Sequence, residues 1–450
     1  MPPIHAVDER MPPGRLFSLA LQHVLVLYAG AVAVPLIVGA ALKLPQDQIA
    51  ILINADLFAG GVATLVQCLG VWKLGARLPV MMGVSFVSVG PMLAMAAAPD
   101  IGLTGIYGGI IAGGLFGMAI APLVTRLLPY FPPVVSGSII LLLGISIAPI
   151  GIRWAGGGIG SPDFGNPANL AIALSVLLVI VALHKWGRGI VRNISVLIGI
   201  AFGYGLCLLL GKVSFGDIDA APMFGLVQPF QFGLPSFHLG AVISMCIVML
   251  VILVESTGMF IAIGDIVERP VDKRTMTRAL MADGAGAVFG GIFNTFPYTS
   301  FTQNIGLISM TGVRSRYVCA AGGVIMIILG VLPKLAHAVA TIPPYVLGGA
   351  GIVMFGMVIA SGVRMLSEVD FTSNKDNLLI VAISCCVAMI PLAAPTFFGQ
   401  FPAWLSPITH SGILLGAVTA FSLNLLLNGR TRSAADALAE HGAAMKRSEA

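Results

Sequence analysis

The segment PPVVSG at residues 132–137 and the segment PPYVLG at residues 343–348 share the pattern PPxVxG and lie 211 residues apart. A second matching pair, SF at 85–86 and SF at 300–301, lies 215 residues apart, and a glycine follows each member within six residues. Proline at the start of a helix is favourable, because its missing N–H would have no partner there. The nearly equal separations therefore predict an internal duplication in which each PPxVxG segment opens a helix.

The composition around these segments excludes a soluble fold. The chain has 450 residues, of which 57% are hydrophobic and only 10% charged, with a mean hydropathy of +0.98. Soluble domains carry about 25% charged residues, and a water-facing surface could not hide this much apolar area. A soluble enzyme, a disordered chain and a nucleic-acid binder are excluded. The composition predicts a polytopic membrane protein.

Fourteen segments are apolar enough to span a bilayer, which needs about 20 residues per helix. They are 17–42, 49–71, 78–98, 103–125, 133–152, 169–184, 193–211, 239–264, 279–294, 297–312, 317–333, 343–363, 377–393 and 408–428. The duplication divides them into seven and seven. Because seven is odd, corresponding spans cross the membrane in opposite directions, as in the inverted repeats of secondary transporters. The predicted fold is all-α, with fourteen transmembrane segments in a 7+7 inverted repeat.

The third and tenth spans, 78–98 and 297–312, are short and interrupted by proline and glycine. Matched broken spans in two repeats indicate a binding site near the middle of the membrane. We expect a short extended stretch in each, followed by a half-helix whose free N–H groups face the site. The alternative is a pair of ordinary kinked helices.

The distribution of positive charge predicts the orientation. With both ends in the cytosol, 20 of the 24 Lys and Arg residues fall in cytosolic segments. Cytosolic loops are enriched in these residues, so we expect an even number of spans, both termini in the cytoplasm and insertion in the cell (inner) membrane.

Ionisable groups inside spans are costly and are usually functional. Glu255 lies in the middle of the eighth span, where it could carry a proton and bind substrate, or make a structural hydrogen bond. Asp283 and Asp56 lie near span ends, where structural roles compete with functional ones. His23 could orient Asp283 or Gln303, or satisfy a core hydrogen bond. Because no P-loop, GxSxG or HExxH motif is present, we expect an ion gradient to drive transport, with no enzymatic activity, metal or cofactor.

The string QNIGLISMT at 303–311 resembles the QNxGxxxxT signature of the nucleobase–ascorbate transporters, also called nucleobase:cation symporter-2. The preceding NTFPYTSF and the early LQHVLVLYAGAVAVPL are similar to that family, and the resemblance extends from about 15 to 428. It implies a core (transport) domain at 17–125 and 239–333 and a gate domain at 133–211 and 343–428. The segments 1–16 and 429–450 are then a cytosolic N-terminus and tail.

The resemblance also implies roles for individual residues. The substrate would contact the side chains of Glu255, Gln303 and Phe86, and backbone groups at Ser85 and Thr302. An amide at 303 resembles the xanthine and uric acid permease branch and suits the alternating N–H and C=O edge of an oxopurine. The residues that would support the site or the proton coupling are Glu255, Asp283, His23 and Asn304.

Met259 is a departure from some xanthine-type members, which have an acid at this place. Urate is a monoanion at neutral pH, and a second carboxylate would repel it. The methionine therefore favours urate over xanthine.

We therefore expect a proton-coupled symporter that imports uric acid, xanthine or both, with the purine, the proton and the lipid bilayer as partners and no nucleic acid. The resemblance implies a homodimer. The alternatives are a uracil or other nucleobase symporter of the same family, an anion exchanger of the wider fold, and a purine sensor.

Overall fold

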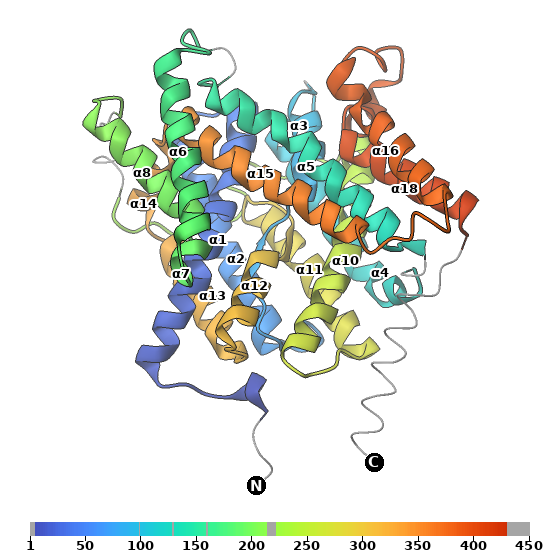
Figure 1. Ribbon diagram of the computed structural model, residues 1–450, viewed down its shortest axis with the longest axis horizontal. Coiled ribbons are helices and arrows are strands. Elements are labelled where there is room, and N and C mark those ends of the chain that lie inside the picture. The colour runs from blue at the N-terminus through green and yellow to red at the C-terminus, as the bar shows by residue number, and fades with distance from the viewer. Residues whose placement is uncertain (1–4, 99, 128–129, 159–160, 214–221, 430–450) are drawn as a thin grey trace.

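The computed structural model describes residues 5–98, 100–127, 130–158, 161–213 and 222–429, and within them it is almost entirely helical (Figure 1). Eight helices are long and apolar enough to cross a membrane, or ten if each of two sharply bent helix pairs counts as one span. The expected fourteen segments each contain a helix, and the third and tenth also contain a strand. The expected tail at 429–450 lies outside the described residues beyond 429.

Both PPxVxG segments open helices as expected. α5 (Pro133–Ala155) and α15 (Pro344–Leu366) each have proline at the N-cap and at the first helical position. The fixed φ of proline is already helical, so these residues set the start of each helix. α5 and α15 pack against each other more extensively than any other pair of described elements.

Residues 334–342, which lie between the expected eleventh and twelfth spans, are mostly helical. α13 (Arg316–Gly330) is followed by α14 (Pro333–Ala340) at an angle of 79°. A proline cannot continue a helix, since it lacks an N–H and its ring clashes with the preceding turn. Pro333 therefore ends the first helix and begins the second. The fourteenth span is also bent, by 76°, between a short helical segment at 403–409 and α18 (Gly412–Leu427).

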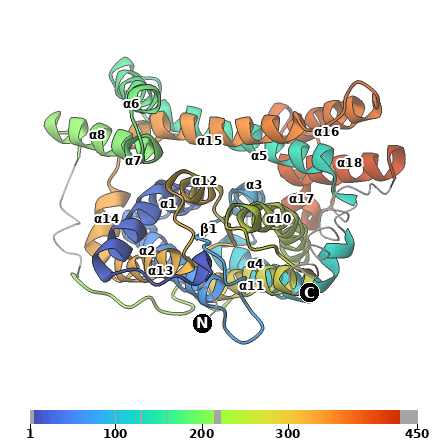
Figure 2. The same ribbon diagram turned by 60° about the horizontal axis from the view of Figure 1, so that its bottom comes forward.

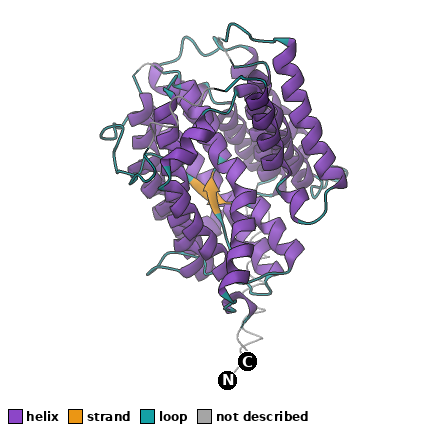
Figure 3. Ribbon diagram, turned by 90° about the vertical axis from the view of Figure 1, so that its left-hand side faces the viewer, coloured by secondary structure: helices purple, strands orange, loops and turns teal. Residues whose placement is uncertain are grey.

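The two interrupted spans meet as a pair of antiparallel strands at the middle of the molecule (Figure 3). β1 (Met82–Val84) belongs to the third span and β2 (Tyr298–Ser300) to the tenth. β1 leads through η2 (Phe86–Ser88) into α3 (Val89–Ala96), and β2 leads into α12 (Thr302–Thr311). Irregular backbone at this depth is stable only when protein surrounds it. All three residues of each strand are buried.

The strand register reproduces the sequence repeat. Met82 pairs with Ser300, and the 215-residue offset maps this pair onto Ser85 and Pro297. These residues are also hydrogen bonded, since Ser85 N–H donates to the Pro297 carbonyl at 2.8 Å. The strand pair is thus mapped onto itself when the two halves are exchanged, as an inverted repeat requires.

The helices form two layers, which are separate in Figure 2. One layer holds α5 and α15 with α6 (Pro167–Trp186), α7 (Ile190–Asn193), α8 (Ser195–Leu209), α16 (Asp376–Ala393) and α18. The other layer surrounds the strand pair. It contains α1 (Pro13–Ala41), α2 (Gln46–Leu69), α3, α4 (Gly102–Leu127), α10 (Leu239–Ile266), α11 (Lys273–Ile292), α12, α13 and α14.

Candidate functional site

A cavity of about 300 Å³ lies between α10 in the layer around the strands and α5 and α15 in the other layer. Its wall is mostly aliphatic, which is usual for a small-molecule site. Glu255 on α10 lines it, and Oε2 of this carboxylate is buried without a hydrogen-bond partner. Thr257 and Ser136 provide further polar groups, and Glu368 lies where α15 ends. A buried acceptor without a partner stabilises a ligand that donates to it.

Neighbouring residues fix Glu255 close to both interrupted spans. The Ser256 and Thr299 hydroxyl oxygens are 3.0 Å apart and join α10 to β2. On the other side, Val87 of η2 lines the same cavity. Glu255 therefore lies on a helix that contacts both broken spans, and it shares its cavity with Val87 of the first of them.

Ser85 and Phe86 follow β1, but neither lines this cavity in the structure. Ser85 is buried, and its hydroxyl accepts from Val87 N–H at 3.3 Å while its carbonyl accepts from the Ser88 hydroxyl at 2.7 Å. Phe86 is half-buried and stands edge-on to Phe355 of α15, with ring centroids 6.1 Å apart. Phe86 therefore joins the two layers beside the cavity.

α12 begins at Thr302, one residue before the signature segment at 303–311. Gln303 in its first turn is exposed and does not line the cavity. Asn304 is buried, and its amide donates to His23 Nδ1 at 3.0 Å and to the His23 carbonyl at 2.9 Å. Because Nδ1 accepts this bond, the His23 proton sits on Nε2. His23 thus holds Asn304. Of the alternatives that the sequence left open, this is the core hydrogen bond and not a bond to Asp283 or Gln303.

Asp283 is fully buried on α11, which packs against α10, the helix of Glu255. Gln67 of α2 donates from Nε2 to Asp283 Oδ1 at 2.7 Å and to the Ala279 carbonyl at 2.9 Å. The same Gln67 accepts through Oε1 from Ala76 N–H at 2.9 Å. Asp283 Oδ2 is buried without a hydrogen-bond partner. Sequence reasoning missed Gln67, although a polar residue in an apolar span was a signal for it.

Asp56 has a clear structural function. Its Oδ1 accepts from the Tyr298 hydroxyl at 2.9 Å and from the Thr295 hydroxyl at 3.0 Å. Tyr298 belongs to β2, so Asp56 anchors that strand to α2. Met259 lies one turn after Glu255 on α10 and does not line the cavity. Among the residues described, no group of three or more His, Cys, Asp or Glu could hold a metal ion.

Comparison with solved structures identifies the fold. The transmembrane domain of BicA, a cyanobacterium bicarbonate transporter, matches with a TM-score of 0.58 at 18% identity, covering 92% of this chain and 99% of that one. Murine Slc26a9, an anion transporter in the inward-facing state, matches with a TM-score of 0.63 at 12% identity, covering 94% of this chain and 69% of that one. At these identities the likeness extends to architecture alone.

Comparison with protein sequences finds relatives of much higher identity. The uric acid transporter UacT of Escherichia coli strain K12 is 47% identical over 428 residues, which cover 95% of this chain and 89% of UacT. The xanthine permease of Bacillus subtilis strain 168 is 43% identical over 418 residues, which cover 92% and 94% of the two chains. A family model described as "Permease family" matches residues 14–397. The chain therefore belongs to this permease family, the nucleobase–ascorbate transporters, in the branch of the uric acid and xanthine permeases.

Proposed function

We propose that the protein is a proton-coupled symporter that imports uric acid, xanthine or both across the cytoplasmic membrane. The observation that supports it best is the Glu255 carboxylate, which has an unpartnered oxygen on the wall of a cavity of about 300 Å³. An oxopurine is flat and small, and its ring N–H groups can donate to such an oxygen. The uric acid and xanthine permeases that match this chain over nine-tenths of its length support a purine as the substrate.

The two layers act as the transport and gate domains in this proposal. The purine binds at the junction of the broken spans, between the transport domain, which contains Glu255, and the gate helices. Phe86 and the backbone at Ser85 meet one side of the ring, and the first turn of α12, with Thr302 and Gln303, meets the other. Because α12 and α10 belong to the same layer, a rearrangement of the first turn of α12 itself brings Gln303 to the purine in this proposal.

Electrostatics favours an anionic purine at this place. The half-helices α3 and α12 both begin beside the strand pair, and each N-terminus has a partial positive charge. Met259 stands where some relatives would place a second acid, so α10 presents one carboxylate, Glu255, to the cavity; the other carboxylate of the lining, Glu368, lies where α15 ends. We therefore propose urate as the preferred substrate and xanthine as the second. Tenfold stronger competition by xanthine than by urate at pH 7 would reverse this order.

The coupling proton binds to Glu255 in this mechanism. A carboxyl group removed from water accepts a proton more readily, and the protonated acid does not repel an anion. Asp283 supports Glu255 through the buried contacts of α10 with α11, while His23 fixes the start of α12 through Asn304. Loss of the proton to the cytosol resets the site.

Uptake into proteoliposomes tests this function. We expect radiolabelled urate and xanthine to accumulate under an inward proton gradient and an uncoupler to abolish the accumulation. Glu255→Gln should abolish accumulation, while Asp376→Asn, which removes an exposed acid from α16, should accumulate purine normally.

Three results would contradict the proposal. Normal accumulation by Glu255→Gln would exclude Glu255 as the proton carrier. Purine exchange without proton flux would favour an anion exchanger, and preference for uracil would replace the substrate. Purine-dependent alkalinisation outside the vesicles is the matching positive result.

A further inference from the structure

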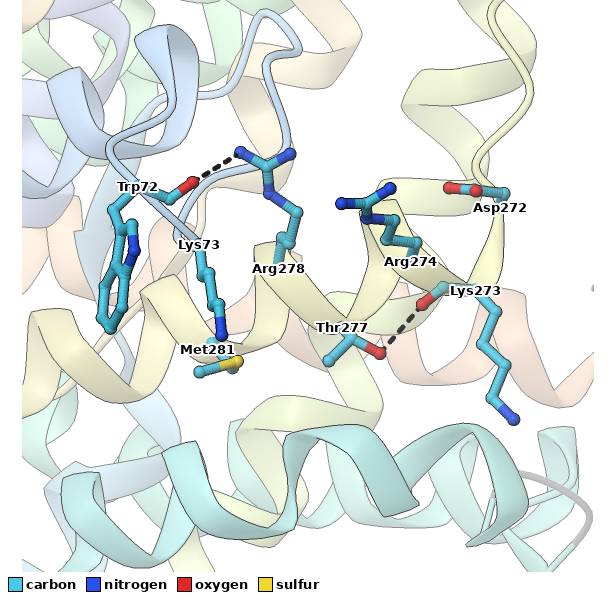
Figure 4. A pocket seen from close by; sticks show the side chains of 8 residues that line it. All are labelled: Trp72, Lys73, Asp272, Lys273, Arg274, Thr277, Arg278 and Met281. Carbon is cyan, nitrogen blue, oxygen red and sulfur yellow. Dashed lines mark hydrogen bonds between the residues drawn. The ribbon is translucent and has the colours of Figure 1, made fainter.

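A second cavity, of about 540 Å³, lies where α11 begins, and it shares no lining residue with the cavity of Glu255 (Figure 4). We call it the basic pocket. Its lining residues come from the first turns of α11 and from the loop after α2. They are Trp72, Lys73, Asp272, Lys273, Arg274, Thr277, Arg278 and Met281.

The charge of the basic pocket is strongly unbalanced. Four of its residues are cations and one, Asp272, is an acid. The Asp272 carboxylate is already engaged as the N-cap of α11, where it accepts from Thr275 N–H at 2.8 Å. The ion pairs formed among the described residues include none of the four cations. Cations gathered in a concave site without counter-charge attract an anion.

Arg278 fixes the two sides of the pocket to each other. Its guanidinium donates to the Trp72 carbonyl at 3.1 Å, and its own carbonyl accepts from Gly75 N–H at 2.9 Å. Its Nε is buried without a hydrogen-bond partner. The loop is thus held at a fixed place beside the helix, and one donor in the wall has no acceptor from the protein.

The rim and the floor of the pocket are apolar, unlike an ordinary charged surface. The Trp72 side chain is 83% exposed, and Lys73 places its ammonium 5.3 Å from the centre of the indole ring. Val71 beside it is 54% exposed, and Met281 lines the pocket one turn beyond the cations. Exposed tryptophan next to lysine and arginine is typical of the membrane–water boundary.

We propose that the basic pocket binds the headgroup of an anionic phospholipid. Lys273 and Arg274 bind the phosphate, while Trp72 and Met281 contact the glycerol and the first acyl carbons. The charge excess selects an anionic lipid over a zwitterionic one, because a choline group would meet the same cations. Soluble anions lack the apolar part that the indole and the thioether accommodate.

Bound lipid would stabilise the layer around the strand pair, because the loop in the pocket wall is hydrogen bonded to Gln67. The loop that forms one wall reaches Gln67 through the Ala76 N–H, and Gln67 holds Asp283 on α11. A headgroup that bridges the loop and the start of α11 therefore opposes separation of α2 from α11.

A lipid-binding experiment on the purified protein in neutral-detergent micelles tests the proposal. Native mass spectrometry counts the bound dioleoylphosphatidylglycerol molecules, and the temperature of thermal unfolding is the second readout. The test variant is Lys273→Gln/Arg274→Gln. The matched control is Lys185→Gln/Arg188→Gln, which removes the same charge beside another exposed tryptophan, Trp186, outside the pocket. Monodisperse elution in gel filtration confirms that each variant is folded.

We expect phosphatidylglycerol, but not phosphatidylcholine, to bind and to raise the unfolding temperature. The test variant should bind it about 30-fold more weakly, and the control variant within about twofold of the parent. An equal loss of phosphatidylglycerol affinity in both variants would show that general surface charge is responsible, and it would contradict a specific site in the basic pocket. Displacement of the lipid by millimolar inorganic phosphate would assign the pocket to a soluble anion and also overturn the proposal.

Discussion

Replacing Gln67 with leucine should destabilise the protein strongly, although the two side chains are similar in size. Gln67 is fully buried and makes three hydrogen bonds, to Asp283, Ala279 and Ala76. Leucine makes none of them. The Ala279 carbonyl keeps its partner within the helix, but Asp283 Oδ1 and Ala76 N–H lose theirs. Each orphaned buried group costs about 1–3 kcal/mol, so the variant should lose about 2–6 kcal/mol of unfolding free energy.

Titration of the purified protein with SDS in mixed micelles measures this loss. Gln46→Leu makes the same change in the exposed first turn of α2, and it should cost less than about 0.5 kcal/mol. The double variant Gln67→Leu/Asp283→Asn should lose less than the sum of the single variants, because a neutral amide needs less solvation than a carboxylate. A cost below about 1 kcal/mol for Gln67→Leu, or additive costs in the cycle, would refute the hydrogen bond between Gln67 and Asp283.

Three further predictions concern other parts of the molecule. Gly83→Ala would place a methyl group 2.7 Å from the ring of Phe301, so thermal unfolding should reveal a loss of about 1–3 kcal/mol in unfolding free energy. Gly306→Ala is the control and should be neutral, because no atom lies within 4 Å of the added methyl group. Phe86→Ala removes an edge-on ring contact between the layers that is worth about 0.5–1.5 kcal/mol, so thermal unfolding should reveal a loss of at least that size, and an unchanged unfolding temperature would contradict the contact with Phe355. Arg314 donates a hydrogen bond at 2.8 Å to Glu268 and lowers the pKa of that exposed carboxyl. The pair therefore stabilises the fold above the ordinary carboxyl pKa, and this contribution is lost as the pH falls through the lowered pKa. Arg314→Gln should remove this part of the fall in unfolding temperature at acidic pH.

The elements that the sequence predicted depend on local rules. The PPxVxG segments start helices because proline fixes φ wherever it occurs, and the broken spans contain strands because their prolines and glycines interrupt the helix locally. Glu255 stood out as an acid in the middle of an apolar span, and it does line a cavity. Such features need no knowledge of which segments meet.

The pairing of distant side chains could not be predicted in this way. His23 binds Asn304 across 281 positions, and Gln67 binds Asp283 across 216 positions. Any buried donor could have satisfied either partner, so the choice is made by the packing of whole helices. The bend at Pro333 was readable from its proline, whereas its angle depends on the helices beside it.

The self-matching register of β1 and β2 bears on how such a protein could arise. Two copies of a half-length ancestor, inserted with opposite orientations, could form the same strand pair as a symmetric dimer. Such a dimer would have to present every acid twice, once on each side of its substrate. In the joined chain the counterpart of α10 is α1, and α1 contains no acidic residue. Fusion of the halves thus permits a single proton-binding carboxylate, which a symmetric ancestor could not have kept unpaired.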